Sequence, residues 1–130
     1  MAGYIIEPGA TTAGKTDMGA YTWREPTTLA LRKQVQQALK DVGRYSGPAD
    51  GAWGPNTIKG IQKSAAKVGY TGPIDGAVGV NTVRYSIDYA YKGSNWNSWY
   101  NTSSGRSNRM YYYPDRVWAD FRKQLVKEDS

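Results

Sequence analysis

Apolar residues recur at helical spacing in the middle of the chain, separated by polar and charged residues. In residues 27–43 the apolar positions fall three or four residues apart, which predicts one amphipathic helix. Thr27 or Thr28 is suited to cap the start of this helix, and Gly43 to end it. Its predicted buried face consists of Leu31, Val35, Ala38, Leu39 and Val42.

Two more segments carry the same pattern. Residues 55–68 begin with Pro55, a residue favoured in the first turn of a helix, and residues 81–91 form a shorter helical stretch. Their predicted buried positions are Ile58, Ile61, Ala65 and Val68 in one and Val83, Ile87 and Ala90 in the other. We therefore expect a mainly α fold in which three short helices share one core.

A fourth segment with apolar residues at helical spacing lies near the end of the chain. Asp115 is placed to cap a last helix, whose apolar face would be Val117, Trp118, Phe121 and Leu125. That face must be buried against the three-helix core or against another chain, and packing on its own core is the simpler arrangement.

Turn-forming residues suggest where these parts meet. Pro26 and the run Gly93-Ser94-Asn95 are the expected boundaries. They divide the 130 residues into an extended N-terminal arm (1–26), a helical domain (27–92) and an aromatic, polar segment with the C-terminal helix (93–130).

The helical domain contains an internal repeat. Residues 45–57 read YSGPADGAWGPNT and residues 70–82 read YTGPIDGAVGVNT, an offset of 25 residues, so one supersecondary unit is used twice. Each copy predicts a tight turn followed by a helix start. Asp50 and Asp75, each before a glycine, are expected to cap the turns rather than act as catalytic acids. The N–H groups at the helix starts are expected to bond to Thr57 and Thr82, or to Asn56 and Asn81.

At these residues the sequence resembles the three-helix peptidoglycan-binding domain, a targeting module of phage endolysins, wall amidases and carboxypeptidases. The matching positions are Val35-Gln36, Gly43, Tyr45, Gly47, Asp50-Gly51, Trp53-Gly54-Pro55, Thr57, Gly69-Tyr70, Asp75-Gly76, Val78-Gly79 and Thr82. Two positions depart from the family pattern: Ser64-Ala65 replaces a usual Phe-Gln, and Val80 replaces a usual Pro. We expect shifted packing near Ser64, or a ring from outside the domain in that space.

The resemblance implies a glycan-binding surface on the two loops. Its candidate residues are Tyr45, Asp50, Trp53, Tyr70 and Asp75. Trp53 has two possible roles, plugging the core beneath its loop or stacking on a sugar, and the core role is favoured because the family position is usually apolar.

The amino-acid composition limits the reactions and partners to be expected of this chain. The chain has no Cys and no His, which excludes thiolate nucleophiles, imidazole bases and the usual zinc ligands, so we expect no enzyme, no metal and no cofactor. A net charge of +6 suits anionic partners. The 11 Tyr and 5 Trp indicate contact surfaces. Candidate assembly contacts are Tyr4, Ile5, Ile6, Trp23, Trp96, Trp99, Tyr111, Tyr112 and Tyr113.

Residues 9–16 read GATTAGKT, a match to the phosphate-binding loop of nucleotide hydrolases. That motif requires a preceding buried strand and a helix that starts at the lysine. Pro8 and the following Gly19 and Pro26 are incompatible with both. We therefore expect an extended arm rather than a nucleotide site.

These features favour a non-enzymatic virion protein. The expected protein is a phage capsid decoration or tail-associated component in many copies, whose partners are capsid or tail proteins, peptidoglycan, or both. It would be made in the host cytoplasm, since the N-terminus lacks an export signal, and no run approaches membrane-spanning length. One alternative is a free-standing wall-binding module or endolysin targeting subunit. A second is a basic nucleic-acid-binding protein, which is disfavoured because Lys33, Lys40, Lys59, Lys63 and Lys67 are spaced as on a solvated surface.

Overall fold

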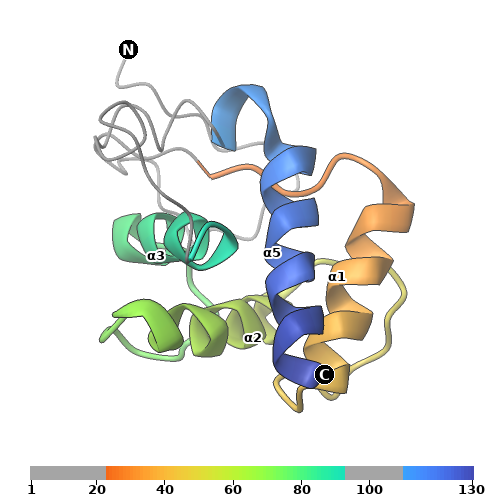
Figure 1. The fold of residues 1–130 in the computed structure, drawn as a ribbon, viewed down its shortest axis with the longest axis horizontal. Coiled ribbons are helices and arrows are strands. Elements are labelled where there is room, and N and C mark those ends of the chain that lie inside the picture. The colour runs from red at the N-terminus through yellow and green to blue at the C-terminus, as the bar shows by residue number, and fades with distance from the viewer. Residues whose placement is uncertain (1–22, 93–109) are drawn as a thin grey trace.

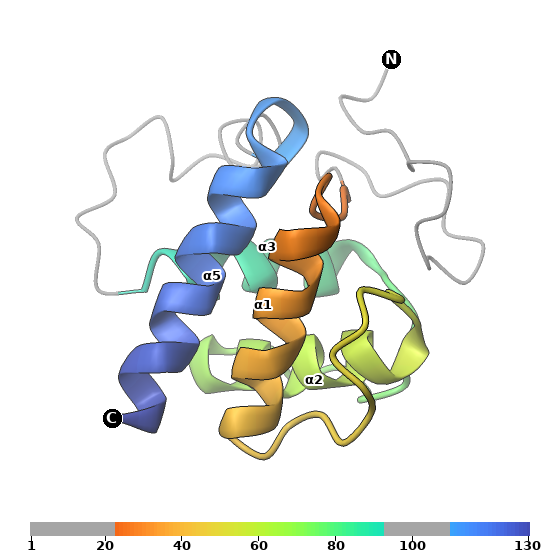
Figure 2. The ribbon, with the colours of Figure 1, turned by 90° about the vertical axis from the view of Figure 1, so that its right-hand side faces the viewer.

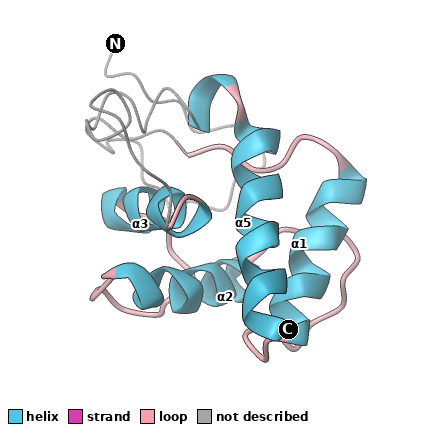
Figure 3. Ribbon diagram, viewed as in Figure 1, coloured by secondary structure: helices cyan, strands magenta, loops and turns pink. Residues whose placement is uncertain are grey.

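The computed structural model describes residues 23–92 and 110–130, and the elements it describes are helices joined by turns (Figure 3). In chain order they are α1 (Leu29–Asp41), α2 (Pro55–Ala65), the short 3-10 helix η1 (Ala66–Val68), α3 (Val80–Ala90) and α5 (Pro114–Asp129). The described part of the chain is therefore mainly α, as predicted. The GATTAGKT motif lies outside the described residues.

The first helix has the predicted ends. Thr28 is the N-cap, and its hydroxyl accepts a hydrogen bond from the N–H of Leu31 at 3.2 Å. The chain leaves α1 through Gly43, whose φ of 78° lies in the left-handed region that favours glycine. The predicted face is correct, because Val35, Ala38 and Leu39 are buried.

Helix α2 starts at Pro55, as predicted, and α3 starts at Val80, one residue before the predicted start, but the side-chain capping differs from the prediction. Gly54 and Gly79 are the N-cap residues, and neither helix has a side-chain capping hydrogen bond there. Thr57 and Thr82, expected near the helix N–H groups, are buried and accept hydrogen bonds from glutamine amides inside the domain. The helix starts thus rely on the glycine-led turns rather than on side-chain caps.

Helices α1, α2, α3 and α5 enclose one core. Figure 1 and Figure 2 show α1 and α5 side by side, with α2 crossing them at one end and α3 lying along α2. The C-terminal helix packs on its own domain, against α1 and α3. Its predicted stripe is fully buried, with no exposed surface on Val117, Trp118, Phe121 or Leu125. Asp115 does not cap this helix, since Tyr113 is the N-cap; its carboxylate instead accepts hydrogen bonds from the N–H and hydroxyl of Thr27 at 2.7 and 2.5 Å.

The segment before α1 belongs to the same packed unit. Trp23 is completely buried, edge-to-face against Trp118 with ring centroids 5.4 Å apart. The indole N–H of Trp118 donates to the carbonyl of Arg24 at 2.7 Å. Residues expected to lie in the extended arm therefore contribute to the core, which begins before Pro26.

A polar cluster fastens the end of α5 to the loop after α1. The guanidinium of Arg44 donates to both carboxylate oxygens of Glu128, at 2.6 and 3.1 Å, and to the hydroxyl of Ser64 at 3.1 Å. Tyr89 donates its hydroxyl hydrogen to the same carboxylate. The hydrogen bond from Arg44 is the main cause that lowers the pKa of Glu128 from 4.5 to about 2. The pKa of Tyr89 is raised, chiefly by burial.

This cluster accounts for the unusual serine. Ser64 is buried, and its hydroxyl both donates to the carbonyl of Gly60 and accepts from Arg44. Aromatic bulk reaches the core from α5 instead, through Trp118 and Phe121. At Ser64 itself the described partners are Arg44 and Gly60, which fits the expected shift in packing rather than a ring in that space.

Candidate functional site

Each copy of the repeat forms a turn built around a buried glutamine. In the first copy, Gln36 of α1 accepts a hydrogen bond from the N–H of Gly51 at 2.8 Å. Its amide donates to the carbonyl of Ala52 at 2.9 Å and to the hydroxyl of Thr57 at 3.1 Å. One buried side chain therefore satisfies an N–H and a C=O group of the turn and also contacts the first turn of α2.

In the second copy Gln62 of α2 has the same role. Its carbonyl oxygen accepts from the N–H groups of Asp75 and Gly76, both at 3.0 Å. Its two amide hydrogens are shared among four acceptors 3.0 to 3.4 Å away, the nearest being the carbonyl of Ala77. Sequence reasoning missed Gln62, because it lies 26 residues after Gln36 while the turns are 25 residues apart. The sequence signal was the apolar-Gln pair Ile61-Gln62 ahead of the second turn, which corresponds to Val35-Gln36 ahead of the first.

The tyrosine and aspartate of each turn are also structural. The hydroxyls of Tyr45 and Tyr70 donate to the carbonyls of Pro48 and Pro73, at 2.8 and 2.7 Å. The predicted turn capping is confirmed: one carboxylate oxygen of each aspartate accepts the N–H two residues on, at 2.9 Å in the first copy and 3.0 Å in the second. These acids hold loops, and their hydrogen-bonding resembles turn chemistry rather than that of a general acid.

Trp53 occupies the core. Only 6% of its surface is exposed, and it packs edge-to-face on Trp118 with ring centroids 5.4 Å apart. Val78, the equivalent residue of the second copy, is also fully buried. Among the five glycan candidates, Trp53 therefore points inward, and a sugar has no access to its ring faces. Tyr70 is also largely buried, with 7% of its surface exposed.

The second turn borders an open depression of about 380 Å³. Tyr70 and Asp75, both glycan candidates, line it together with the start of α3. Val80, which also lines the depression, and Ile74, which lies in the chain between the lining residues Pro73 and Asp75, each expose 39% of their surface. The first copy has Pro55 and Ala49 at these positions. Tyr45 lines a different depression, beside α2. The structure thus brings two of the candidates together and separates them from the rest.

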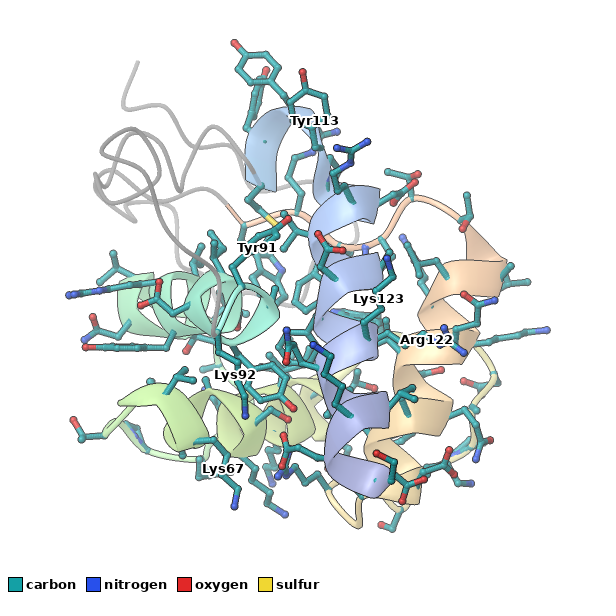
Figure 4. All side chains as sticks on the ribbon, viewed as in Figure 1. Lys67, Tyr91, Lys92, Tyr113, Arg122 and Lys123 are labelled. Carbon is teal, nitrogen blue, oxygen red and sulfur yellow. The ribbon has the colours of Figure 1, made fainter. Side chains whose placement is uncertain are left out.

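A second exposed surface lies at the start of α5. Tyr112 and Tyr113 are 65% and 55% exposed, and Figure 4 shows Tyr113 at the end of the molecule where α5 begins. Behind them the Arg24 guanidinium lies 5.3 Å from the centre of the Tyr111 ring and donates to the Tyr111 carbonyl at 2.6 Å. A depression of about 400 Å³ runs beside this surface.

The other assembly candidates have different positions. Trp23 is a core residue with no exposed surface, so its expected role as an intermolecular contact conflicts with its burial. The remaining candidates lie outside the described residues; they are Tyr4, Ile5, Ile6, Trp96 and Trp99.

Positive charge is spread over several elements. Lys67, Lys92, Arg122 and Lys123 come from η1, the end of α3 and α5, and lie on the face shown in Figure 4. Within residues 23–92 and 110–130, no group of three or more acidic, His or Cys side chains could hold a metal ion. None of the helices in those two ranges is long and apolar enough to cross a membrane.

Comparison with known proteins gives no family assignment: no family model matches the chain, and searches of curated proteins and of solved structures find no significant match.

Proposed function

We propose that this chain is a non-enzymatic, structural binding protein of a phage virion surface, with a peptidoglycan-binding-like domain directed at the host wall. The observation that carries the proposal is the depression at the second turn. Its lining includes the edge of the largely buried Tyr70, the exposed carboxylate of Asp75 and the exposed apolar Val80, on a turn held from inside by Gln62. Such a surface can bind a glycan or a short peptide without rearrangement.

The chemistry of the carboxylates supports binding rather than catalysis. Asp50 and Asp75 are engaged in their turns. Glu128 has a lowered pKa, whereas a carboxylic acid that donates a proton near neutral pH needs a raised one. The groups that sequence reasoning would offer as acids are thus occupied in holding the fold.

Attachment to a particle is supported by the exposed tyrosines. Tyr112 and Tyr113, with Arg24 and Arg116 beside them, are residue types that are enriched in protein interfaces. The depression that they line shares no residue with the one at the second turn. One surface could therefore hold a capsid or tail protein while the other faces the wall.

Wall binding is tested by co-sedimentation of the full-length protein with purified sacculi at low and moderate salt. The decisive variant is Ile74→Ala/Val80→Pro, which introduces the residues of the first copy into the second, so the turn should still form. Loss of two apolar contacts is expected to weaken binding about tenfold. The control, Ala49→Ile, makes the reverse exchange in the first copy and should bind normally. Pro55 is left unchanged in the control because it lies against Gly76 of the second turn.

Two results would contradict the proposal. Absence of saturable binding by the unaltered protein, or equal losses in Ile74→Ala/Val80→Pro and in Ala49→Ile, would remove the second turn as a wall site. The virion assignment has its own test, mass spectrometry of particles purified from the phage whose genome encodes the chain. Recovery of the chain only in the unassembled fraction of the lysate would refute that assignment.

A further inference from the structure

The two copies of the repeat share a backbone pattern but differ on the helix that follows each turn. In the first copy α2 carries Lys59 and Lys63, one helical turn apart. The equivalent positions of α3 are Arg84 and Asp88, which form an ion pair at 4.0 Å. A favourable pair of opposite charges in one copy is therefore replaced by a pair of like charges in the other.

The lysine pair is electrostatically costly for the helix alone. Like charges four residues apart on a helix repel each other. Neither lysine makes an ion pair with any residue that the structure describes. Lys63 suits the last turn of α2, where a cation complements the helix dipole, but Lys59 lies in the first half of the helix and gains nothing there.

The lysines border a depression of about 240 Å³, which the loop Gly43–Ser46 and Asn56 complete. Gly60 brings α2 close to this loop, because a Cβ at that position would lie 2.8 Å from the carbonyl oxygen of Arg44. In the second copy Tyr85 takes the place of Gly60, and its ring lies against Gly69 and Tyr70. The corresponding surface of the second copy is thus covered by a ring and neutralised by an ion pair.

Arg44 also lines the depression, but its guanidinium is engaged by Glu128 and Ser64, so its charge is balanced. The uncompensated charge comes from Lys59 and Lys63. Ser46 and Asn56 are exposed and add a hydroxyl and an amide as hydrogen-bond donors. No carboxylate lines the depression.

We propose that this depression binds a single phosphate group, with Lys59 and Lys63 as its cationic ligands and Ser46 and Asn56 as hydrogen-bond donors. The site is one small depression rather than a stripe along the molecule, which favours a phosphate of a flexible polymer over the regularly spaced phosphates of duplex DNA. The carrier we infer is a glycerol-phosphate wall polymer. That choice of carrier rests on the proposed function, whereas the phosphate site does not. Lys59 and Lys63, whose spacing in the sequence predicted a solvated surface, are thus proposed to bind a ligand.

The test is an NMR titration of the ¹⁵N-labelled full-length chain with inorganic phosphate, with chloride used to keep the ionic strength constant. Saturable shifts are expected at the amides of residues 43–46 and 56. Lys63→Asp, which introduces the charge of the second copy, should weaken phosphate binding at least about tenfold. The spectrum of each variant also reports whether it has folded.

Matched variants distinguish a specific phosphate site from a general effect of the protein's net charge. Asp88→Lys adds the same charge on α3 and should leave the phosphate affinity unchanged. The double variant Lys63→Asp/Asp88→Lys keeps the net charge of +6 and should still lose binding. If the double variant binds phosphate normally, or if the unaltered chain shows no saturable shifts, the proposed site is wrong.

The carrier is tested with poly(glycerol phosphate) and with duplex DNA at equal phosphate concentration. We expect the polymer to shift the same amides as inorganic phosphate. If DNA binds instead, with a steep loss of affinity as salt is raised, the wall-polymer assignment is overturned. Because sacculus binding at the second turn is measured on different residues, failure here and failure of the wall proposal are distinguishable.

Discussion

The contact between Glu128 and Arg44 makes the stability of this fold depend on pH, and Glu128→Gln is the substitution that measures it. Glu128 receives two hydrogen bonds from Arg44 and one from Tyr89, and its pKa falls from 4.5 to about 2 in the folded chain. As the pH falls, Glu128 is therefore protonated at a higher pH in the unfolded chain than in the folded chain. The contact contributes fully above about pH 4.5 and is lost as pH falls toward 2.

The size of the effect follows from the pKa and the exposure. A pKa lowered from 4.5 to about 2 corresponds to at most about 3 kcal/mol of stability at neutral pH. Because the Glu128 side chain keeps 21% of its surface exposed, solvent screens part of this interaction. Removing the charge also leaves Arg44, which is 12% exposed, without its counterion. We expect a loss of about 1–2 kcal/mol at pH 7.

Urea denaturation followed by tryptophan fluorescence measures this loss, since Trp23, Trp53 and Trp118 are all buried in the core. The difference between the unaltered chain and Glu128→Gln should be largest at pH 7 and should approach zero near pH 2. Asp129→Asn is the control, because this neighbouring carboxylate is exposed, and its removal at a helix C-terminus should be neutral or slightly stabilising. If Glu128→Gln lowers the free energy of unfolding equally at pH 7 and pH 2, the ionised form of Glu128 is not the source of the stability.

Three further substitutions test the scaffold by the same denaturation assay. Gln62→Leu should lower the free energy of unfolding by about 3 kcal/mol, because two N–H groups of the turn lose their acceptor. The control Gln37→Ala, on an exposed face, should lower it by less than about 0.5 kcal/mol. If both variants lose the same stability, Gln62 does not hold the turn from inside the domain. Gly76→Ala should cost about 2–4 kcal/mol, because φ is 75° and a Cβ would lie 2.8 Å from a backbone carbonyl oxygen. Gly54→Ala, where the backbone is extended and the space is open, should cost under about 1 kcal/mol. Trp53→Ala should cost about 3–5 kcal/mol, measured by circular dichroism because a fluorophore is lost. Unchanged stability with lost sacculus binding would place Trp53 on the ligand surface instead.

Helix positions were predictable because periodicity and end signals agreed. The stripe Val117, Trp118, Phe121 and Leu125 is read directly from spacing, and burial follows for any helix with such a face. The start of α1 was predictable for the same reason, since the Thr28 hydroxyl acts locally. Asp115 shows the limit of local signals: an acid at a helix start has an alternative partner in Thr27, 88 residues away.

The interior of the turns was less predictable, because it depends on polar contacts between elements. Gln36 and Gln62 are polar residues on amphipathic helices, and spacing alone favours exposing them. They are buried because each turn presents N–H and C=O groups that water does not reach and that only a bidentate amide can satisfy together. Such a requirement becomes visible only when the turn and the helix are placed in three dimensions.

The comparison of the two copies separates what holds the fold from what distinguishes its surfaces. The residues that both copies keep, a glutamine, a tyrosine and an Asp-Gly pair, all direct their hydrogen bonds into the turn. Several of the positions that differ lie on the surface, where Ala49 corresponds to Ile74 and Lys63 to Asp88. A duplicated unit that needed only stability would have no reason to keep unpaired lysines in one copy and exposed apolar residues in the other. This asymmetry argues that the two turns serve as one scaffold carrying two different binding surfaces.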